Sequence, residues 1–181
     1  MAKKKRVILG VTGSIAAYKA AEIIRRLIEH GMRVSVVMTK EAEYFITPLT
    51  LARLSGETVF CEMFPPSCVP AGMPHIDLAR EADLLLIAPA TANTIGKLAH
   101  GIADDLLTCL ALATKAPKII VPAMNTQMYR NPIVQENCQK LKKNGARFIE
   151  PIEGKLACGT TGQGHIADET TIVKAVLQIL K

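Results

Sequence analysis

Aromatic residues are scarce in this chain of 181 residues: they make up 4% of it, and tryptophan is absent. Proteins that bind single-stranded nucleic acid stack bases on aromatic rings, and such platforms need several aromatic side chains. The composition therefore argues against nucleic acid as a partner.

The chain has few cysteines, and their spacing along the sequence shows no paired motif. The chain has five cysteines, an odd number, and no two of them form a CxxC pair. Disulfide frameworks and zinc sites normally show even counts or paired spacings. We therefore expect a reduced, cytoplasmic protein with no bound metal.

Long apolar runs are also missing. No stretch reaches the roughly 18 residues that a membrane span needs, and the N-terminus runs into a strand pattern without a cleavage site. We expect a single domain over residues 1–181 with no membrane contact.

The net charge of the chain is +6, and part of it comes from the basic run at residues 3–6. This run is either a solvated segment that leads into the first strand or a group of side chains that attracts anions such as phosphates.

What is present is an alternation of strand and helix patterns. Helical periodicity alternates with short apolar runs, which predicts βα units, a central parallel sheet and a doubly wound three-layer α/β sandwich. The expected strands are residues 6–13, 33–39, 57–64, 83–91, 117–125 and 146–151. The expected helices are residues 14–31, 41–56 with a break near Pro48, 75–82, 95–115, 131–145 and 169–180.

Small polar residues follow several of these strands. They are found at residues 13–14, 39–40, 89–93 and 122–125. In open α/β sheets, ligands bind outside the carboxyl ends of the strands. Glycine, hydroxyl and amide groups at those ends indicate a ligand with many oxygen atoms.

Two of these strand ends lead directly into a helix. "GVTGSIAAYK", residues 10–19, is a glycine turn with Ser14 as a candidate N-cap, so it is either an anion site or an ordinary turn. Thr91, Asn93 and Thr94 follow the most apolar strand, where they either cap a helix or contact a ligand.

Three residue types could carry chemistry. Asn125 could bind a carboxylate or simply form a turn. His75 precedes a short helix and could transfer a proton near neutral pH. Cys158 lies in "KLACGTTGQGHIAD", residues 155–168, whose glycines predict a loose, mobile loop; its thiol is either an acid or a packed side chain.

Five segments together resemble one family. They are "GSIAAYK" (13–19), "HIDL" (75–78), "PATANTIGKLAHGIADDLL" (89–107), "PAMNTQM" (122–128) and "LACGTTGQG" (156–164). In this order they resemble the FMN-dependent, homo-oligomeric cysteine decarboxylase flavoproteins, and within them the branch that acts on 4′-phospho-N-pantothenoylcysteine in coenzyme A biosynthesis.

The resemblance implies a fold, a cofactor and a reaction. The fold would be flavodoxin-like and the cofactor FMN. The chain would form a trimer, or a dodecamer built from trimers, with the active site at the subunit interface. The substrate thiol would be oxidised to a thioaldehyde, CO₂ would leave, and the enethiolate would be reduced to give 4′-phosphopantetheine.

The resemblance also assigns residues. Those for FMN are Gly13, Ser14, Ile15, Thr39, Thr91, Ala92, Asn93, Thr94 and Ala123. The catalytic residues are His75, Asn125 and Cys158, and the substrate-binding residues are Met124, Asn125, Lys155 and Ala157. Residues 152–167 would form a flap that closes over the substrate. Roles for His100, Asp105, His165 and the loop at residues 65–74 stay open.

Other functions of the same fold are alternatives. One is a peptidyl-cysteine decarboxylase with the same cofactor, and another is a non-enzymatic regulatory protein. A flavin prenyltransferase is disfavoured, because that branch lacks the "PAMN" and "ACG" segments. A phosphopantothenate–cysteine ligase, separate or fused, is the expected partner, and the sequence leaves open whether this chain stands alone.

Overall fold

A central parallel sheet organises the molecule. The computed structural model describes residues 4–64, 73–155, 159 and 161–181. Within them the sheet contains β1 (Arg6–Val11), β2 (Arg33–Met38), β3 (Val59–Phe60), β4 (Leu84–Ala90), β5 (Lys118–Pro122) and β6 (Arg147–Phe148). The strand order is β3-β2-β1-β4-β5-β6, and every pair is parallel.

This order confirms the expected doubly wound fold of flavodoxin type. If the two-residue edge strand β3 is set aside, the remaining order corresponds to the flavodoxin order 2-1-3-4-5. The direction of winding reverses between β1 and β4. A ligand is therefore expected where the carboxyl ends of these two strands diverge.

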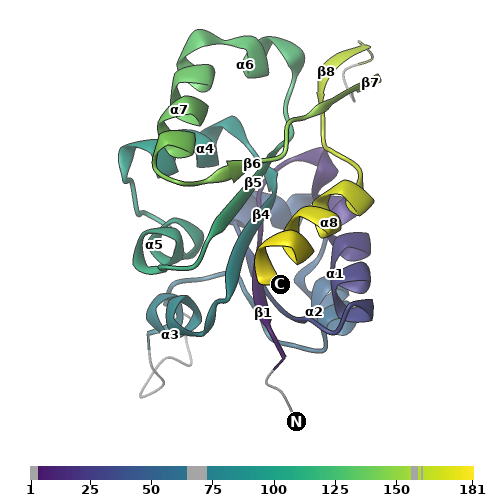
Figure 1. Cartoon of the computed structure of the whole chain (residues 1–181), viewed down its shortest axis with the longest axis vertical. Helices are drawn as coiled ribbons and strands as arrows, with labels where there is room; N and C mark the ends of the chain where they lie inside the picture. Colours follow the sequence, from purple (N-terminus) through teal and green to yellow (C-terminus); the bar gives the residue numbers. More distant parts are fainter. Residues whose placement is uncertain (1–3, 65–72, 156–158, 160) are drawn as a thin grey trace.

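Helices cover both faces of the sheet (Figure 1). One face carries α1, α2 and α8, and the other carries α3, α4, α5 and α7. Their bounds are α1 (Ala20–Glu29), α2 (Pro48–Ser55), α3 (Pro74–Glu81), α4 (Ala92–His100), α5 (Leu106–Ala113), α7 (Pro132–Lys143) and α8 (Glu169–Leu180). Three short helices complete the described residues: η1 (Ile15–Lys19), η2 (Lys40–Tyr44) and α6 (Thr126–Arg130).

The sheet separates two apolar cores. Along β1, Val7, Leu9 and Val11 pack into the core beneath α1 and α8, whereas Ile8 packs into the core beneath α5 and α7. This alternation follows from the two-residue period of a strand. All of β4 is buried, as expected for a central strand covered on both faces.

The single long helix expected over residues 95–115 is wrong. The chain forms α4 and α5 instead, because Gly101 ends α4 in the left-handed region with φ +70°. Asp105 then begins α5 with a capping box, in which its side chain accepts a hydrogen bond from the amide of Thr108 at 2.8 Å.

Other boundaries also differ from the sequence expectations. The expected strands at residues 57–64 and 146–151 are each reduced to two paired residues, β3 and β6. The helix expected from Ser14 begins with the 3₁₀ turn η1 before α1. The break near Pro48 is confirmed, since Pro48 is the first residue of α2 and η2 precedes it.

The segment expected as a loose glycine loop contains regular structure. Strands β7 (Ile152–Lys155) and β8 (Thr161–His165) form a separate antiparallel hairpin, which lies above α8 and α1 in Figure 1. The expectation of a loose loop is therefore wrong for these two strands. Pairing between the strands orders them despite their glycines.

Each helix of the described chain is too short or too polar to cross a bilayer.

Candidate active site

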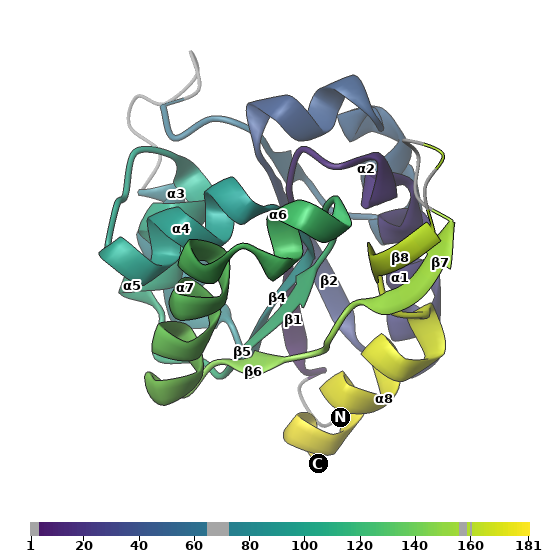
Figure 2. The same ribbon diagram turned by 90° about the horizontal axis from the view of Figure 1, so that it is seen from above.

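A cavity of about 590 Å³ opens at the carboxyl ends of the strands. Figure 2 looks onto this end of the sheet, where the chain leaves β1, β4 and β5 for the helices. Cavities of a few hundred cubic ångströms or more commonly hold small molecules and cofactors. The cavity therefore lies at the position that the strand order predicts, with enough room for a nucleotide-sized ligand.

The loop after β1 forms one wall of the cavity. Gly13 and Ser14 line it, and the Ser14 hydroxyl accepts a hydrogen bond from the amide of Ala16 at 3.3 Å, which begins η1. A Cβ atom on Gly13 would lie 2.4 Å from the Cβ of Glu41, so no side chain fits there. Glycine at this position lets η2 approach the loop closely.

A second wall is the start of α4. Thr91 is the N-cap of α4, and its hydroxyl accepts a hydrogen bond from the amide of Thr94 at 3.2 Å. The amides of Ala92 and Asn93 precede the first possible intrahelical bond of α4, so the helix end can receive an anion. Both residues line the cavity.

Thr12 connects these two walls. Its buried hydroxyl donates a hydrogen bond to the carbonyl of Pro89 at 2.8 Å and accepts one from the amide of Thr91 at 3.1 Å. The end of β1 is thereby fixed to the end of β4, so Thr12 positions both loops.

Thr39 presents an unusual polar atom. It lines the cavity at the end of β2 and is 9% exposed, and its buried hydroxyl has no hydrogen-bond partner among the described residues. Buried hydroxyls normally have a partner. An oxygen-rich ligand in the cavity would supply one, so the site fits such a ligand.

The far side of the cavity is formed by the loop after β5. Ala123, Met124 and Asn125 line it. The side-chain oxygen of Asn125 accepts a hydrogen bond from the amide of Gln127 at 2.8 Å and so caps α6. The amide of Met124 donates to the carbonyl of Gly164 in β8 at 3.1 Å. This contact joins the loop to the hairpin.

Charge in the cavity is sparse. Among the described lining residues the ionisable side chains are Tyr18, Glu41, Asp105 and His165, with no lysine or arginine. The Nδ1 of His165 lies 2.9 Å from the carbonyl of Ile166, which fixes this nitrogen as the donor. The cavity walls thus present mainly neutral hydrogen-bonding groups and apolar surface.

Asp105 is tied to its surroundings. Lys97 lies 3.2 Å from the Asp105 carboxylate and 2.8 Å from that of Asp104. The hydrogen bond to Lys97 lowers the pKa of Asp104, and the hydrogen bond to Asp104 is the largest cause of the raised pKa of Lys97. Asp105 therefore caps α5, pairs with Lys97 and borders the cavity.

The residues that the sequence assigned to the cofactor gather around this cavity. Each of the nine lines it: Gly13, Ser14, Ile15, Thr39, Thr91, Ala92, Asn93, Thr94 and Ala123. Met124 and Asn125 lie beside them. Their binding roles stay predictions.

The other assigned residues lie elsewhere. His75 is on the first turn of α3 and is not among the lining residues; its Nδ1 is buried without a partner in the described chain. Ala157 and Cys158 lie outside the described residues, as does the side chain of Lys155. Their roles also stay predictions.

Sequence reasoning assigned no role to several lining residues. These include Tyr18, Glu41, Asp105, Met128, Gly164 and His165. Glu41 could have been predicted as a lining residue, because it stands two positions after the strand-end residue Thr39. Met128 reaches the cavity through α6, a helix of five residues and too short to show a period in the sequence.

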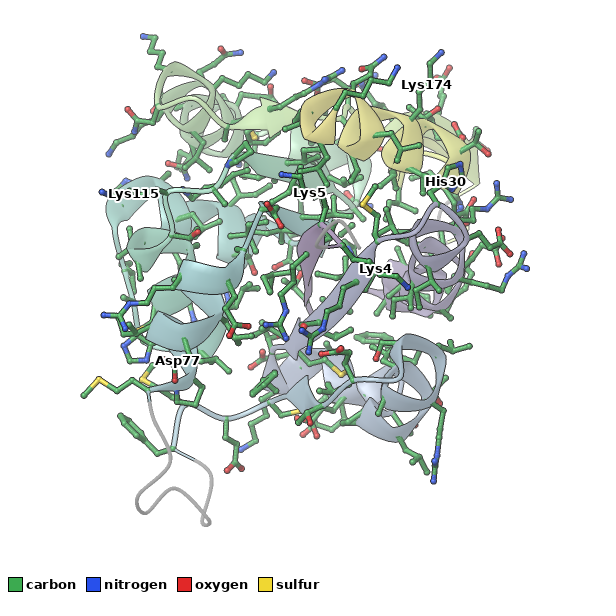
Figure 3. The ribbon with its side chains drawn as sticks, turned by 60° about the horizontal axis from the view of Figure 1, so that its bottom comes forward. Lys4, Lys5, His30, Asp77, Lys115 and Lys174 are labelled. Carbon is green, nitrogen blue, oxygen red and sulfur yellow. The ribbon has the colours of Figure 1, made fainter. Side chains whose placement is uncertain are left out.

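The basic N-terminal run lies at the other end of the sheet. Figure 3, which brings the bottom of the molecule forward, shows Lys4 and Lys5 there, away from the carboxyl ends of the strands. Lys5 forms an ion pair with Asp83 at 3.2 Å. The interpretation of this run as a solvated lead-in to β1 is therefore favoured over a role at the cavity.

Comparison with known proteins identifies the class. The family model described as Flavoprotein matches residues 1–181, so the chain belongs to the flavoprotein family. The chain is 48% identical over 174 residues to a probable phosphopantothenoylcysteine decarboxylase of Streptococcus mutans, covering 95% of this chain and 97% of that protein. It is 50% identical over 169 residues to the coenzyme A biosynthesis bifunctional protein CoaBC of Vibrio cholerae, covering 93% of this chain.

Two solved structures extend the comparison. One is a mutant PPC decarboxylase complexed with pantothenoylaminoethenethiol, with a TM-score of 0.88, 34% identity and coverage of 98% of this chain and 99% of the other. The second is the FMN-dependent cysteine decarboxylase SpaF, with a TM-score of 0.83, 33% identity and coverage of 98% of each chain. The chain spans 42% of the length of the bifunctional Vibrio cholerae protein.

Proposed function

We propose that this protein is an FMN-dependent decarboxylase that converts 4′-phospho-N-pantothenoylcysteine to 4′-phosphopantetheine. One observation carries the proposal. Loops after β1, β2, β4 and β5 bring the nine residues assigned to FMN around a single cavity, with Asn125 beside them. Membership in the flavoprotein family and the decarboxylase relatives support the same function.

The cavity suits a flavin mononucleotide. The start of α4 and the turn at Ser14 would receive the phosphate through backbone amides and hydroxyls. The unpartnered hydroxyl of Thr39 would bond a ligand oxygen, and Ala123 would lie against the ring. When bound, FMN supplies the thiol oxidation and the returning hydride that the protein side chains cannot provide.

Asn125 would orient the substrate carboxylate. A neutral amide can donate a hydrogen bond to a carboxylate without adding charge. A lysine or arginine there would stabilise the carboxylate before CO₂ leaves and so oppose the reaction. The absence of both residue types from the described cavity lining agrees with this role.

Cys158 would protonate the enethiolate carbon. A thiol with an ordinary pKa of about 8.5 is mostly protonated at neutral pH and can serve as a general acid. Lys155 and Ala157, on the same segment, would contact the substrate as the flap at residues 152–167 closes. Closure would exclude water from the reacting carbon.

His75 would come from a neighbouring subunit. It lies outside the cavity of its own chain, on α3, and its Nδ1 is buried without a partner in the described residues. We propose a trimer, or a dodecamer built from trimers, in which His75 of one subunit assists the oxidation step in the next.

The cellular setting follows from the same relatives. The fused CoaBC proteins place a second activity beside their decarboxylase-like part, so a phosphopantothenate–cysteine ligase is the proposed partner.

Cys61, Cys109 and Cys138 are free thiols, and burial raises the pKa of Cys138 to about 11. We also propose a reduced, cytoplasmic location, in which these three thiols would stay free.

The proposal is tested by colour and turnover. Purified protein should be yellow, release FMN on denaturation and remove one CO₂ from 4′-phospho-N-pantothenoylcysteine, as followed by mass spectrometry. Cys158→Ser should bind FMN normally and accumulate the oxidised, decarboxylated intermediate.

Three outcomes would contradict it. A colourless protein that FMN cannot reconstitute excludes a flavoenzyme. Turnover of peptides with a C-terminal cysteine, without turnover of the free substrate, assigns the chain to the peptidyl-cysteine decarboxylases. Full activity in Cys158→Ser removes that thiol from the mechanism.

A further inference from the structure

Strand β8 lies directly against the loop that carries Asn125 and the start of α6. The contact involves Gly162 and Gly164, which stand at alternate positions of β8 and so face the same side. Opposite them are Met124 and Thr126, the two chain neighbours of Asn125. The hairpin therefore touches this loop on both sides of the residue assigned to the substrate carboxylate.

The contact at Gly164 is between backbones. The amide of Met124 donates a hydrogen bond to the carbonyl of Gly164 at 3.1 Å. A Cβ atom on Gly164 would lie 2.2 Å from the carbonyl oxygen of Met124. The φ of +154° at Gly164 is also one that other residues rarely adopt. Any side chain here would push β8 away from the loop.

The contact at Gly162 is with a side chain. A Cβ atom on Gly162 would lie 2.5 Å from the Oγ1 of Thr126 and 3.3 Å from its Cγ2. The Thr126 hydroxyl is buried and has no hydrogen-bond partner among the described residues. Thr126 thus occupies the space that a larger residue at position 162 would need.

We propose that Gly162 and Gly164 are positioning residues for Asn125. Their lack of side chains, and not their freedom of motion, lets β8 seat against the loop and hold Asn125 at the cavity wall. This inference rests on the proposed role of Asn125. It predicts that β8 stays packed on the Asn125 loop at Gly162 and Gly164 while the rest of the flap closes.

A steric role and a flexibility role respond differently to paired substitutions. Gly162→Ala introduces a clash with Thr126, and Thr126→Ala removes both clashing atoms, so the double variant should recover. Gly164→Ala clashes with backbone, so Thr126→Ala should not rescue it. Gly154→Ala on β7 is the matched control, because its Cβ would lie 3.4 Å from His165, an ordinary contact.

The first readout is steady-state kinetics. Gly162→Ala should lower kcat/KM by roughly 10- to 100-fold, the scale expected when a substrate-orienting group is displaced by about an ångström. Binding of FMN to Gly162→Ala should change less than twofold, because the side chain that Gly162 approaches is that of Thr126, which is not assigned to the cofactor. The Gly162→Ala/Thr126→Ala variant should return to within about threefold of the parent, on the scale of coupled neighbours in double-mutant cycles.

The second readout does not depend on activity. The Gln127 amide donates to the Asn125 side chain at 2.8 Å. Its hydrogen exchange in the FMN-bound protein should be faster in Gly162→Ala and Gly164→Ala, and normal in the rescued double variant and in Gly154→Ala. This measurement stands even if the substrate proves to be different from the one proposed.

Three results would contradict the positioning role or separate it from the proposed function. Equal losses in Gly154→Ala and Gly162→Ala, with no rescue by Thr126→Ala, would assign the glycines to flexibility. Unchanged exchange at Gln127 in every variant would show that β8 does not position Asn125. A parent protein that does not turn over the substrate but shows the expected exchange pattern would contradict the proposed function and leave the positioning role supported.

Discussion

At the scale of single residues, two buried threonine hydroxyls differ in their hydrogen bonding, one in the core at Thr114 and one at the cavity at Thr39. Thr114 is 5% exposed, and its hydroxyl donates to the carbonyl of Ala79 at 3.1 Å and accepts from the amide of Ala116 at 3.1 Å. Thr39 is 9% exposed, and its hydroxyl has no partner in the described chain. An unmade hydrogen bond lowers stability unless a ligand completes it.

Thr39→Val should separate ligand binding from folding. Valine keeps the shape and removes the hydroxyl, so the stability of the cofactor-free protein should be unchanged or slightly higher. The Kd for FMN should rise about tenfold, which corresponds to the loss of about 1.4 kcal/mol of hydrogen bonding. Fluorescence titration with FMN and urea unfolding measure the two quantities.

Thr114→Val is the control for this comparison. Its hydroxyl is already satisfied within the protein, so its removal should lower stability by about 1 kcal/mol and leave FMN affinity unchanged. Thr39→Val with parental FMN affinity would show that this hydroxyl does not face the cofactor.

At the scale of elements, the break between α4 and α5 brings an acid to the cavity. The end of α4 at Gly101 and the capping box at Asp105 turn the chain so that Asp105 borders the site. A continuous helix would have carried this carboxylate elsewhere. Asp105 therefore serves the fold first, through its bonds to Thr108 and Lys97.

Asp105→Ala should destabilise the protein by about 1 kcal/mol, the usual effect of losing an N-cap side chain. Asp104→Ala is the matched control: Asp104 also pairs with Lys97, yet it is exposed and caps no helix. The urea midpoint at neutral pH should fall for Asp105→Ala and stay near the parent for Asp104→Ala. Equal shifts for the two variants would indicate that the ion pair, and not the cap, stabilises this turn.

The elements also show how far sequence patterns reach. The buried run of β4 and the amphipathic α1 and α7 were predictable, because each is long enough to show a period. The α4–α5 break was missed because apolar residues continue across it, although Gly101 and the acid pair were visible signals. The hairpin was missed because its order comes from pairing between strands and from contact with α6, neither of which is local.

The candidate site was more predictable than the boundaries. The residues assigned to the cofactor follow strand ends, and parallel strands bring those ends together. Glu41, Met128 and His165 could not be found this way, since they reach the cavity through η2, α6 and β8. The placement of these three elements depends on tertiary packing.

At the scale of the whole molecule, an ion-paired cluster around Glu57 and the cavity lie at opposite ends of the sheet. At the amino ends of the strands, Glu57 joins Arg6 and Arg33 in an ion-paired cluster, with N–O distances of 3.2 Å and 2.5 Å. The hydrogen bond from Arg33 is the largest cause of the lowered pKa of Glu57, although partial burial opposes it. These ion pairs connect β1, β2 and the turn before β3 and so stabilise this end of the sheet.

Glu57→Gln should show a pH-dependent loss of stability. Because the pKa of Glu57 is lower in the folded state, its stabilising effect is present above the unfolded value of about 4.3 and is lost as the pH falls through the folded value. At pH 7 the variant should be less stable by about 1 kcal/mol, since Arg33 is half exposed. The difference should vanish in acid.

Urea unfolding from pH 7 to pH 3 measures this effect. The exposed Glu136 provides the control, and Glu136→Gln should match the parent across the range. A constant difference between Glu57→Gln and the parent at every pH would show that packing, and not charge, is responsible.

The proposed role of His75 in a neighbouring subunit can be tested with mixed oligomers. If His75 acts in a neighbouring site, co-expressed His75→Asn and Asn125→Gln chains should form mixed oligomers in which some sites have both native residues. Their activity should exceed that of either variant alone. Mixed oligomers with no regained activity would show that each chain uses its own His75.

The part of the cavity lining that the structure describes contains no lysine or arginine, and this has a consequence for cofactor retention. Ionic strength weakens attraction between separated charges, and the Debye length falls to about 3 Å at 1 M salt. Contacts from amides and hydroxyls act at hydrogen-bond distance inside a recess, where mobile ions have little access. The protein should therefore keep its flavin through high-salt chromatography, whereas a phosphate held by surface lysines would be washed away.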